Sequence, residues 1–175
     1  QQDIFDEFCS SLQGQMHTLK IADPSERETD IGPIIDMTAV SKLQQHVTWL
    51  NSNAKLIARS TVDTVSDTGL AQRLFPPCAY QVESISQIKD ENFGPILHVI
   101  PFAHNELQQI LADINHTGYG LTMGLHSRNQ DWLDHIIRQV NVGNIYINRN
   151  MVGAKVSSQP FGGHGLSGTG PKAGG

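Results

Sequence analysis

The sequence predicts an α/β fold, in which βαβ units form a largely parallel sheet with helices packed against it. Three short apolar runs, at 96–102, 121–126 and 145–147, have the length of buried strands. Two stretches between them carry apolar residues at helical spacing, the first at Leu107, Ile110, Leu111 and Ile114, the second at Trp132, Leu133, Ile136, Ile137 and Val140. Strands that alternate with helices in this order are typical of a parallel sheet.

Capping residues and glycines indicate where the predicted helices begin and end. Asn105 can cap the first of these two helices, which ends at Gly118, and the second ends near Gly143. Nearer the N-terminus, Thr38 is expected to cap a helix whose buried stripe is Val40, Leu43, Val47 and Leu50. A further amphipathic helix opens the chain, and its apolar face is formed by Ile4, Phe5, Phe8, Cys9 and Leu12.

Breaker residues and polar stretches separate these elements. Turns are expected at 23–24 and 32–33, and a polar loop at 60–69. The apolar segment 74–82 contains two prolines, which suits the start of a strand or an edge strand. From Met151 onward no regular pattern is predicted, and seven of the 16 glycines fall in the last fourteen residues. Because a compact domain seldom finishes on such a loop, we expect the 175 residues to be cut from a longer chain at both ends.

Composition narrows the class of protein. The chain has 12 Lys and Arg against 17 acidic residues, a net charge of -5, and no basic cluster that could follow a phosphate backbone, so nucleic acid is not an expected partner. The sequence shows no apolar run of membrane-spanning length and no signal peptide. Two cysteines are too few for a disulfide framework and agree with a cytoplasmic location.

Several apparent motifs are not expected to form a binding or catalytic site. The stretch 163–168 has the spacing G-x-G-x-x-G, but no preceding strand, following helix or downstream acidic residue completes a dinucleotide fingerprint. The eight histidines form no metal-binding pattern, so no metal site is expected. Cys9 lies on an apolar helix face and Cys78 follows two prolines without a neighbouring base, so neither is expected to be a nucleophile.

Two segments carry residue types suited to binding. In the stretch 91–95, Glu91 can accept hydrogen bonds from sugar hydroxyls and Phe93 can supply a flat apolar wall, although a turn with an incidental glutamate explains the pattern equally well. In the stretch 148–161, Gly153 permits close approach of backbone to a ligand, and successive N–H groups can bind an anion. A disordered tail is a slightly better explanation of this second segment from the residues alone.

Taken together, these segments resemble the aldehyde dehydrogenase superfamily. The motifs follow the family's order along nearly the whole chain: TDIGPII at 29–35, ENFGP at 91–95, GYGLT at 118–122, VGNIYIN at 142–148, and PFGG at 160–163 with Ser-Gly at 167–168. The stretches 148–154 and 165–175 are similar to the proline utilization A branch, which oxidises glutamate semialdehyde to glutamate. We therefore expect residues 1–175 to be the C-terminal part of the catalytic domain, with 149–175 as a glycine-rich substrate-anchor loop and tail.

The resemblance implies an NAD-dependent parent enzyme and roles for five residues. Glu91 matches the family residue that holds the nicotinamide ribose, and Phe93 the aromatic near the nicotinamide ring. Gly153 and Ala154 match the loop whose N–H groups bind the substrate's α-carboxylate, and Phe161 the aromatic beside its aliphatic chain. These two groups of residues are expected to share one cleft.

The same resemblance implies that the catalytic residues are missing from this chain, and it indicates the expected partners. The family's nucleophilic cysteine and general-base glutamate precede the matched region, so no catalytic residue is expected here and the fragment alone should be inactive. The expected partners are the small-molecule substrate, the remainder of the parent chain and further copies of a homo-oligomeric parent; FAD is implied only if a proline dehydrogenase half is present. The sequence departs from the family pattern at Asn92, Lys155, Ser157 and Ser158.

Two other functions remain open at this point. The parent could act on a different semialdehyde, or the chain could be a non-catalytic binding or assembly module that keeps the fold.

Overall fold

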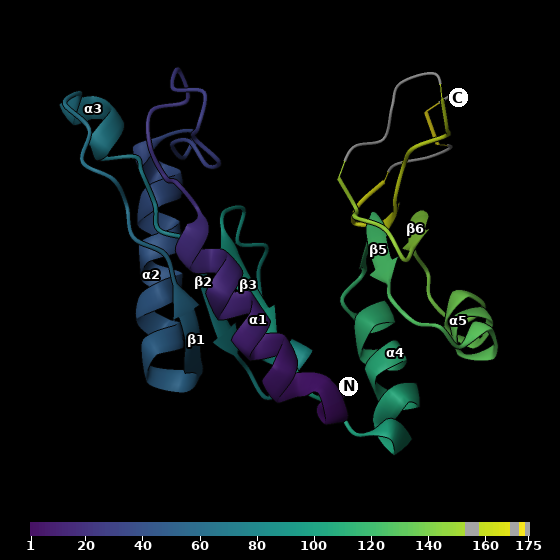
Figure 1. Cartoon of the computed structure of the whole chain (residues 1–175). Coiled ribbons are helices and arrows are strands. Elements are labelled where there is room, and N and C mark those ends of the chain that lie inside the picture. The colour runs from purple at the N-terminus through teal and green to yellow at the C-terminus, as the bar shows by residue number, and fades with distance from the viewer. Residues whose placement is uncertain (153–157, 169–171, 174–175) are drawn as a thin grey trace. The chain divides into compact units, whose positions relative to one another are not determined.

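The computed structural model describes residues 1–152, 158–168 and 172–173, which divide into two compact units with the boundary between His104 and Asn105 (Figure 1). The first unit contains the longer helices, α1 (Phe5–Thr18) and α2 (Met37–Asn53). Its strands are β1 (Lys55–Arg59), β2 (Cys78–Gln81) and β3 (Ile96–Val99). Short helical segments complete it: η1 (Gln2–Ile4), α3 (Thr68–Ala71) and η2 (Ile85–Gln87).

The three strands of the first unit form one mixed sheet in the order β1-β2-β3. Strand β2 pairs with β3 in parallel, with Tyr80 opposite His98, and with β1 in the antiparallel sense. Successive side chains of a strand point to opposite faces, so alternate residues of β2 enter different layers.

Helices α1 and α2 cover opposite faces of this sheet (Figure 1). One core cluster joins the α2 residues Leu43, Val47 and Leu50 to Tyr80 of β2, together with Phe75, Cys78 and Val82. The other joins Met16 of α1 to Ala79 of the same strand, together with Ile57 and Ala58. The first unit is therefore a helix–sheet–helix sandwich with a core on each side.

The second unit is built around one βαβ motif. Strand β5 (Thr122–Leu125) and strand β6 (Asn144–Ile147) pair in parallel and are connected through helix α5 (Gln130–Ile137). Helix α4 (Leu107–His116) follows the short turn η3 (His104–Glu106) and joins α5 and β5 in a core of Leu111, Leu125, Leu133 and Ile136. A separate pair of two-residue strands, β4 (Tyr119–Gly120) and β7 (His164–Gly165), is antiparallel.

This architecture confirms the predicted class, an α/β fold with parallel strands flanked by helices. The predicted stripe of α2 is buried, with Leu50 fully inaccessible to water. In the part of the chain that the structure describes, none of the helices has the length and apolar character needed to cross a membrane.

Several local predictions were wrong. Asp36 rather than Thr38 caps α2, accepting a hydrogen bond from the Ala39 N–H at 2.7 Å. Asn105 lies within η3 instead of capping α4, whose N-cap is Glu106. Strand β1 was not foreseen. Of the two predictions for the segment 74–82, the start of a strand is confirmed, since both prolines precede β2, and the edge strand is wrong, because β1 places β2 in the centre of the sheet. Among the residues after Met151 that the structure describes, His164 and Gly165 form the short strand β7, where no regular element was predicted.

The core around α2 sets a first expectation for stability. We expect Leu50→Ala to lower the free energy of unfolding by roughly 2 to 5 kcal/mol, because the lost methyl groups leave a cavity against Tyr80 and Val47. Gln45→Ala, at an exposed position of the same helix, is the matched control and should change it by less than about 0.5 kcal/mol. Urea unfolding of both variants measures the difference, and equal effects would contradict the assigned core.

Candidate functional site

Glu91 and Phe93 lie in an irregular stretch of the first unit that leads into β3. Both side chains are exposed, and the Phe93 ring is 86% accessible. The end of the stretch is held firmly, since the Pro95 carbonyl accepts a hydrogen bond from the Cys78 N–H at 3.0 Å. A Cβ on Gly94 would lie 2.5 Å from a methyl group of Leu43, so a larger residue here would displace a buried side chain of α2.

This arrangement fits one end of a nicotinamide dinucleotide. A solvent-accessible carboxylate can accept hydrogen bonds from two ribose hydroxyls, and an aromatic ring that the protein leaves uncovered can pack against a planar ring. Asn92, where the sequence departs from the family pattern, donates a hydrogen bond to the Asp90 carbonyl at 2.9 Å. That contact is confined to the turn and leaves β3 in its parallel register with β2.

In the second unit, Phe161 lies on the face of the β5–β6 pair that is turned away from α4 and α5. Strand alternation places Met123, Leu125 and Ile145 on the helix side, in or against the α4–α5 core. Asn144 and Tyr146 therefore occupy the other side, where the chain around Phe161 passes. Phe161 itself is half-buried and forms an isolated antiparallel bridge with Ala173.

Gly153 and Ala154 lie outside the described residues, as do Lys155 and Ser157, so only the chain on either side of them is defined. Before them, Asn148 has a φ of 52°, and its side chain contacts both backbone groups of Ser127, accepting from the N–H and donating to the carbonyl at 2.9 Å each. After them, Gln159 donates a hydrogen bond to the Tyr146 hydroxyl at 3.1 Å. Both flanks are thus tied to the β5–β6 pair.

The G-x-G-x-x-G stretch has a packing explanation. Its residues His164 and Gly165 form β7 against β4, and Gly165 has a φ of 58°. An added Cβ on Gly165 would overlap the carbonyl oxygen of Gly118, and one on Gly168 that of Gly163. Sequence reasoning rejected the stretch as a dinucleotide fingerprint but missed this role, because close backbone contacts between distant glycines leave no periodic signal.

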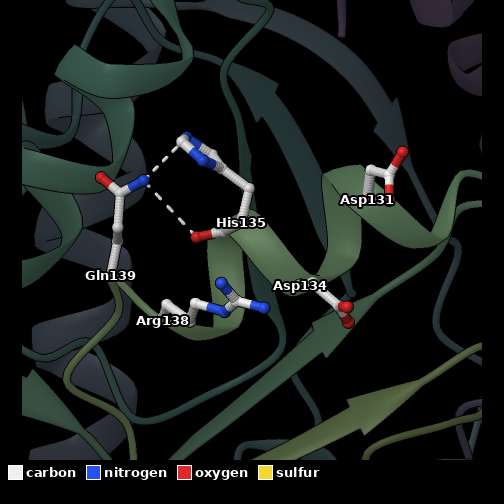
Figure 2. A pocket seen from close by; sticks show the side chains of 5 residues that line it. All are labelled: Asp131, Asp134, His135, Arg138 and Gln139. Carbon is white, nitrogen blue, oxygen red and sulfur yellow. Dashed lines mark hydrogen bonds between the residues drawn. The ribbon is translucent and has the colours of Figure 1, made fainter.

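A surface hollow lies along α5, and none of the five predicted site residues is among its lining residues. Figure 2 shows its lining side chains, which come from this helix and the residues just after it: Asp131, Asp134, His135, Arg138 and Gln139. The Gln139 side-chain amide contacts the His135 ring at 2.7 Å. Within the described residues, no three His, Cys, Asp or Glu side chains are arranged to hold a metal ion.

Comparison with known proteins identifies the family. The profile of the aldehyde dehydrogenase family matches residues 1–175. The chain belongs to the aldehyde dehydrogenase family. It is 38% identical over 177 aligned residues to the bifunctional protein PutA of Escherichia coli, covering 100% of this chain and 13% of that protein. It is 31% identical to the 1-pyrroline-5-carboxylate dehydrogenase of Bacillus subtilis, covering 99% of this chain and 33% of that enzyme.

Solved structures agree with this assignment. A crystal structure of Bradyrhizobium japonicum proline utilization A superimposes with a TM-score of 0.91 at 42% identity, over 99% of this chain and 17% of that chain. The chain thus spans a small part of the PutA relatives and a third of the length of the single dehydrogenases that it matches.

The two cysteines of this aldehyde dehydrogenase segment are poorly suited to nucleophilic chemistry. Burial raises the pKa of Cys78, and the nearby Arg59 offsets this only in part. Burial also raises the pKa of Cys9, with a further contribution from Asp6. A raised pKa keeps a thiol protonated at neutral pH, and the thiolate is the nucleophilic form.

A contact between two histidines was not foreseen from the sequence. His46 of α2 and His98 of β3 approach with their Nε2 atoms 2.8 Å apart, and His46 stacks on Trp49 at 5.8 Å between ring centroids. At this distance one ring must donate its N–H to the lone pair of the other, so the pair cannot be doubly protonated without breaking the contact. Burial lowers the pKa of both rings, and repulsion from His46 lowers that of His98 further.

This pair predicts a loss of stability in mild acid. The pKa values of both histidines in the folded protein lie below the usual 6.5. At pH values between these lowered pKa values and 6.5, the unfolded chain therefore binds more protons than the folded protein. Stability should therefore be full above about pH 6.5 and fall as the pH decreases toward the lowered values. Urea unfolding at several pH values measures this slope. The double variant His46→Gln/His98→Gln should have a smaller slope of unfolding free energy against pH. His17→Gln, at an exposed helix position, is the control and should reduce this slope less. Equal slopes in the unaltered protein and both variants would contradict the role of the pair.

Proposed function

We propose that this chain is the C-terminal part of the catalytic domain of an NAD-dependent dehydrogenase that oxidises L-glutamate γ-semialdehyde to L-glutamate in proline catabolism. The observation that supports this most strongly is the similarity along the whole chain to PutA and 1-pyrroline-5-carboxylate dehydrogenases, at 38% and 31–33% identity. Pyrroline-5-carboxylate is the cyclic form of the same semialdehyde. The parent protein is proposed to be cytoplasmic and homo-oligomeric, with FAD only if it also contains a proline dehydrogenase half.

NAD, when bound, supplies the hydride acceptor. On the side of the protein, the Glu91 carboxylate accepts hydrogen bonds from the nicotinamide ribose hydroxyls and so fixes the position of the sugar. Phe93 covers one side of the nicotinamide site and keeps water from it. The exposure of both side chains and the fixed Gly94–Pro95 turn beside them support these roles.

The substrate end of the site is proposed to lie in the segment 149–175. Backbone N–H groups of Gly153 and Ala154 bind the α-carboxylate, since successive main-chain N–H groups carry the partial positive charge that suits an anion. Phe161 packs beside the aliphatic carbons of the substrate. The hydrogen bonds on the two flanks, from the Asn148 amide to the Ser127 carbonyl and from the Gln159 amide to the Tyr146 hydroxyl, support a substrate site beside the β5–β6 pair.

The cysteine nucleophile and the glutamate base are proposed to belong to a part of the parent that precedes residue 1. The raised pKa values of Cys9 and Cys78 support this assignment, since neither thiol is prepared for attack on an aldehyde.

Kinetics of the parent enzyme test the two ends of the site separately. Glu91→Gln removes the charge but keeps an acceptor, so we expect the KM for NAD to rise roughly tenfold while the KM for glutamate semialdehyde changes little. Phe161→Ala should do the reverse, raising the KM for the semialdehyde roughly tenfold through lost apolar contact. The two variants serve as controls for each other, and effects on the same substrate would refute the division of roles.

A related dehydrogenase for another semialdehyde is the second candidate within the family. Both aldehydes carry a carboxylate, but succinate semialdehyde lacks the α-amino group and its carboxylate lies one carbon closer to the aldehyde, so an anchor placed for glutamate semialdehyde should bind it less well. Comparison of kcat/KM for both aldehydes with the parent decides between them, and a preference for succinate semialdehyde would overturn the proposed substrate.

The 175 residues alone should show no NAD reduction with any aldehyde and negligible affinity for NAD, since most of the cofactor site is proposed to lie elsewhere. Spectrophotometric assay and calorimetry measure both. Turnover by this segment would show that the nucleophile had been assigned to the wrong part of the protein. A non-catalytic module is the remaining alternative, and a start codon directly upstream of Gln1, with no dehydrogenase sequence before it, would favour it.

A further inference from the structure

The segment around Phe161 is hydrogen-bonded along both of its edges. On one edge, the Phe161 N–H donates to the Ala173 carbonyl at 3.1 Å and the Ala173 N–H donates to the Phe161 carbonyl at 2.9 Å. On the other edge, the side-chain amide of Asn144 takes the place of a second strand. It donates to the Pro160 carbonyl at 3.0 Å and accepts from the Gly162 N–H at 3.3 Å.

The geometry explains why one side chain can reach both neighbours of Phe161. In an extended chain, the N–H and carbonyl of one residue point to one edge, while the preceding carbonyl and the following N–H point to the other. An asparagine amide carries one acceptor oxygen and a donor nitrogen, so it can satisfy both of the latter groups at once. The Phe161 backbone is thereby fixed while its half-buried side chain remains available for contact.

Asn144 is itself held in a defined position. It opens β6 opposite Thr122, and its own N–H donates to the Leu121 carbonyl at 3.0 Å. The preceding residue, Gly143, runs so close to Gly162 that an added Cβ would overlap the Gly162 carbonyl oxygen. The Lys172 ammonium also donates to the Gly143 carbonyl, which ties the Ala173 side of the bridge to the same point of the strand.

We propose that Asn144 is a positioning residue that sets the place of the Phe161 ring, and through it the recognition of the substrate's aliphatic chain. This rests on the proposed function, in which Phe161 contacts the substrate. Asn144 touches neither substrate nor cofactor; it acts through the backbone of residues 160 and 162.

The chain contains a matched structural control. The Asn115 side chain makes the same pair of contacts around Val140, donating to the Gln139 carbonyl at 2.7 Å and accepting from the Asn141 N–H at 2.8 Å. Val140 packs against the α4–α5 core and has no proposed role in binding. Asn115→Ala therefore removes an equivalent pair of hydrogen bonds at a place where only stability should respond.

The test is a double-mutant cycle on the full dehydrogenase that carries this chain. Asn144→Ala should raise the KM for glutamate semialdehyde roughly threefold to tenfold, with the KM for NAD and kcat changed less than about twofold. In a Phe161→Ala background the same substitution should change the KM for the semialdehyde no further, because the positioned ring is gone. Asn115→Ala should leave all three constants near those of the unaltered enzyme.

A conservative variant covers the case in which Asn144→Ala does not fold. Asn144→Asp keeps the acceptor for the Gly162 N–H and loses the donor to Pro160, so it should also raise the same KM. Additive effects of Asn144→Ala and Phe161→Ala, or an equal effect of Asn115→Ala, would overturn the proposal. If Phe161→Ala leaves the KM unchanged, the proposed role of Phe161 fails. If Phe161→Ala raises it and neither Asn144 variant does, only the positioning role fails.

Discussion

Strand β6 packs against the α4–α5 core on one face and binds the chain around Phe161 on the other, and most of the second unit depends on these two sets of contacts. Its alternating side chains send Ile145 into the α4–α5 core, while Asn144 and Tyr146 meet the chain that returns from the segment after Asn148. One strand four residues long therefore supplies both the apolar contacts that hold the βαβ motif and the polar contacts that hold the proposed substrate segment. A shift of one residue in its register with β5 would exchange the two faces and lose both.

In the first unit, the proposed cofactor residues are held through backbone packing. The Glu91–Phe93 stretch is fixed where it enters β3, by the close approach of Gly94 to Leu43 and the hydrogen bond from the Cys78 N–H to the Pro95 carbonyl. Leu43 belongs to the buried stripe of α2, so the position of the proposed cofactor residues depends on the packing of a helix distant in sequence. The His46–His98 contact links the same helix to the strand that follows.

The sequence was most informative where a feature repeats along the chain. The stripe of α2 and the βαβ order were predicted because helical and strand periodicity are local. The α2 cap was misplaced because Asp36 and Thr38 are both good capping residues, and the choice depends on the residue at which the backbone enters the helix; it does so after Asp36, whose carboxylate accepts from the Ala39 N–H. Strand β1 was missed because it is only five residues long and follows α2 after a single residue, Ala54.

Some residues of the proposed site could likewise be predicted from the sequence, and others could not. Glu91, Phe93 and Phe161 were selected from motifs, where residue types and order are visible in the sequence. Asn144, also within a motif, gave no sign of its partners, because Pro160 and Gly162 lie sixteen and eighteen residues away and contribute only backbone atoms.

Backbone-directed contacts also explain which residues this part of the fold can use. An apolar side chain at position 144 could fill the same space, but it would leave the Pro160 carbonyl and the Gly162 N–H without this partner. A longer amide would carry the same groups too far from β6, and a carboxylate would lack the donor. Glycine at 143 lets its backbone come close to the Gly162 carbonyl, which brings the two chains near enough for the shorter amide to reach. Gly143 and Asn144 are thus parts of one arrangement, in which close backbone approach is the condition for a hydrogen-bonded support on both edges of Phe161.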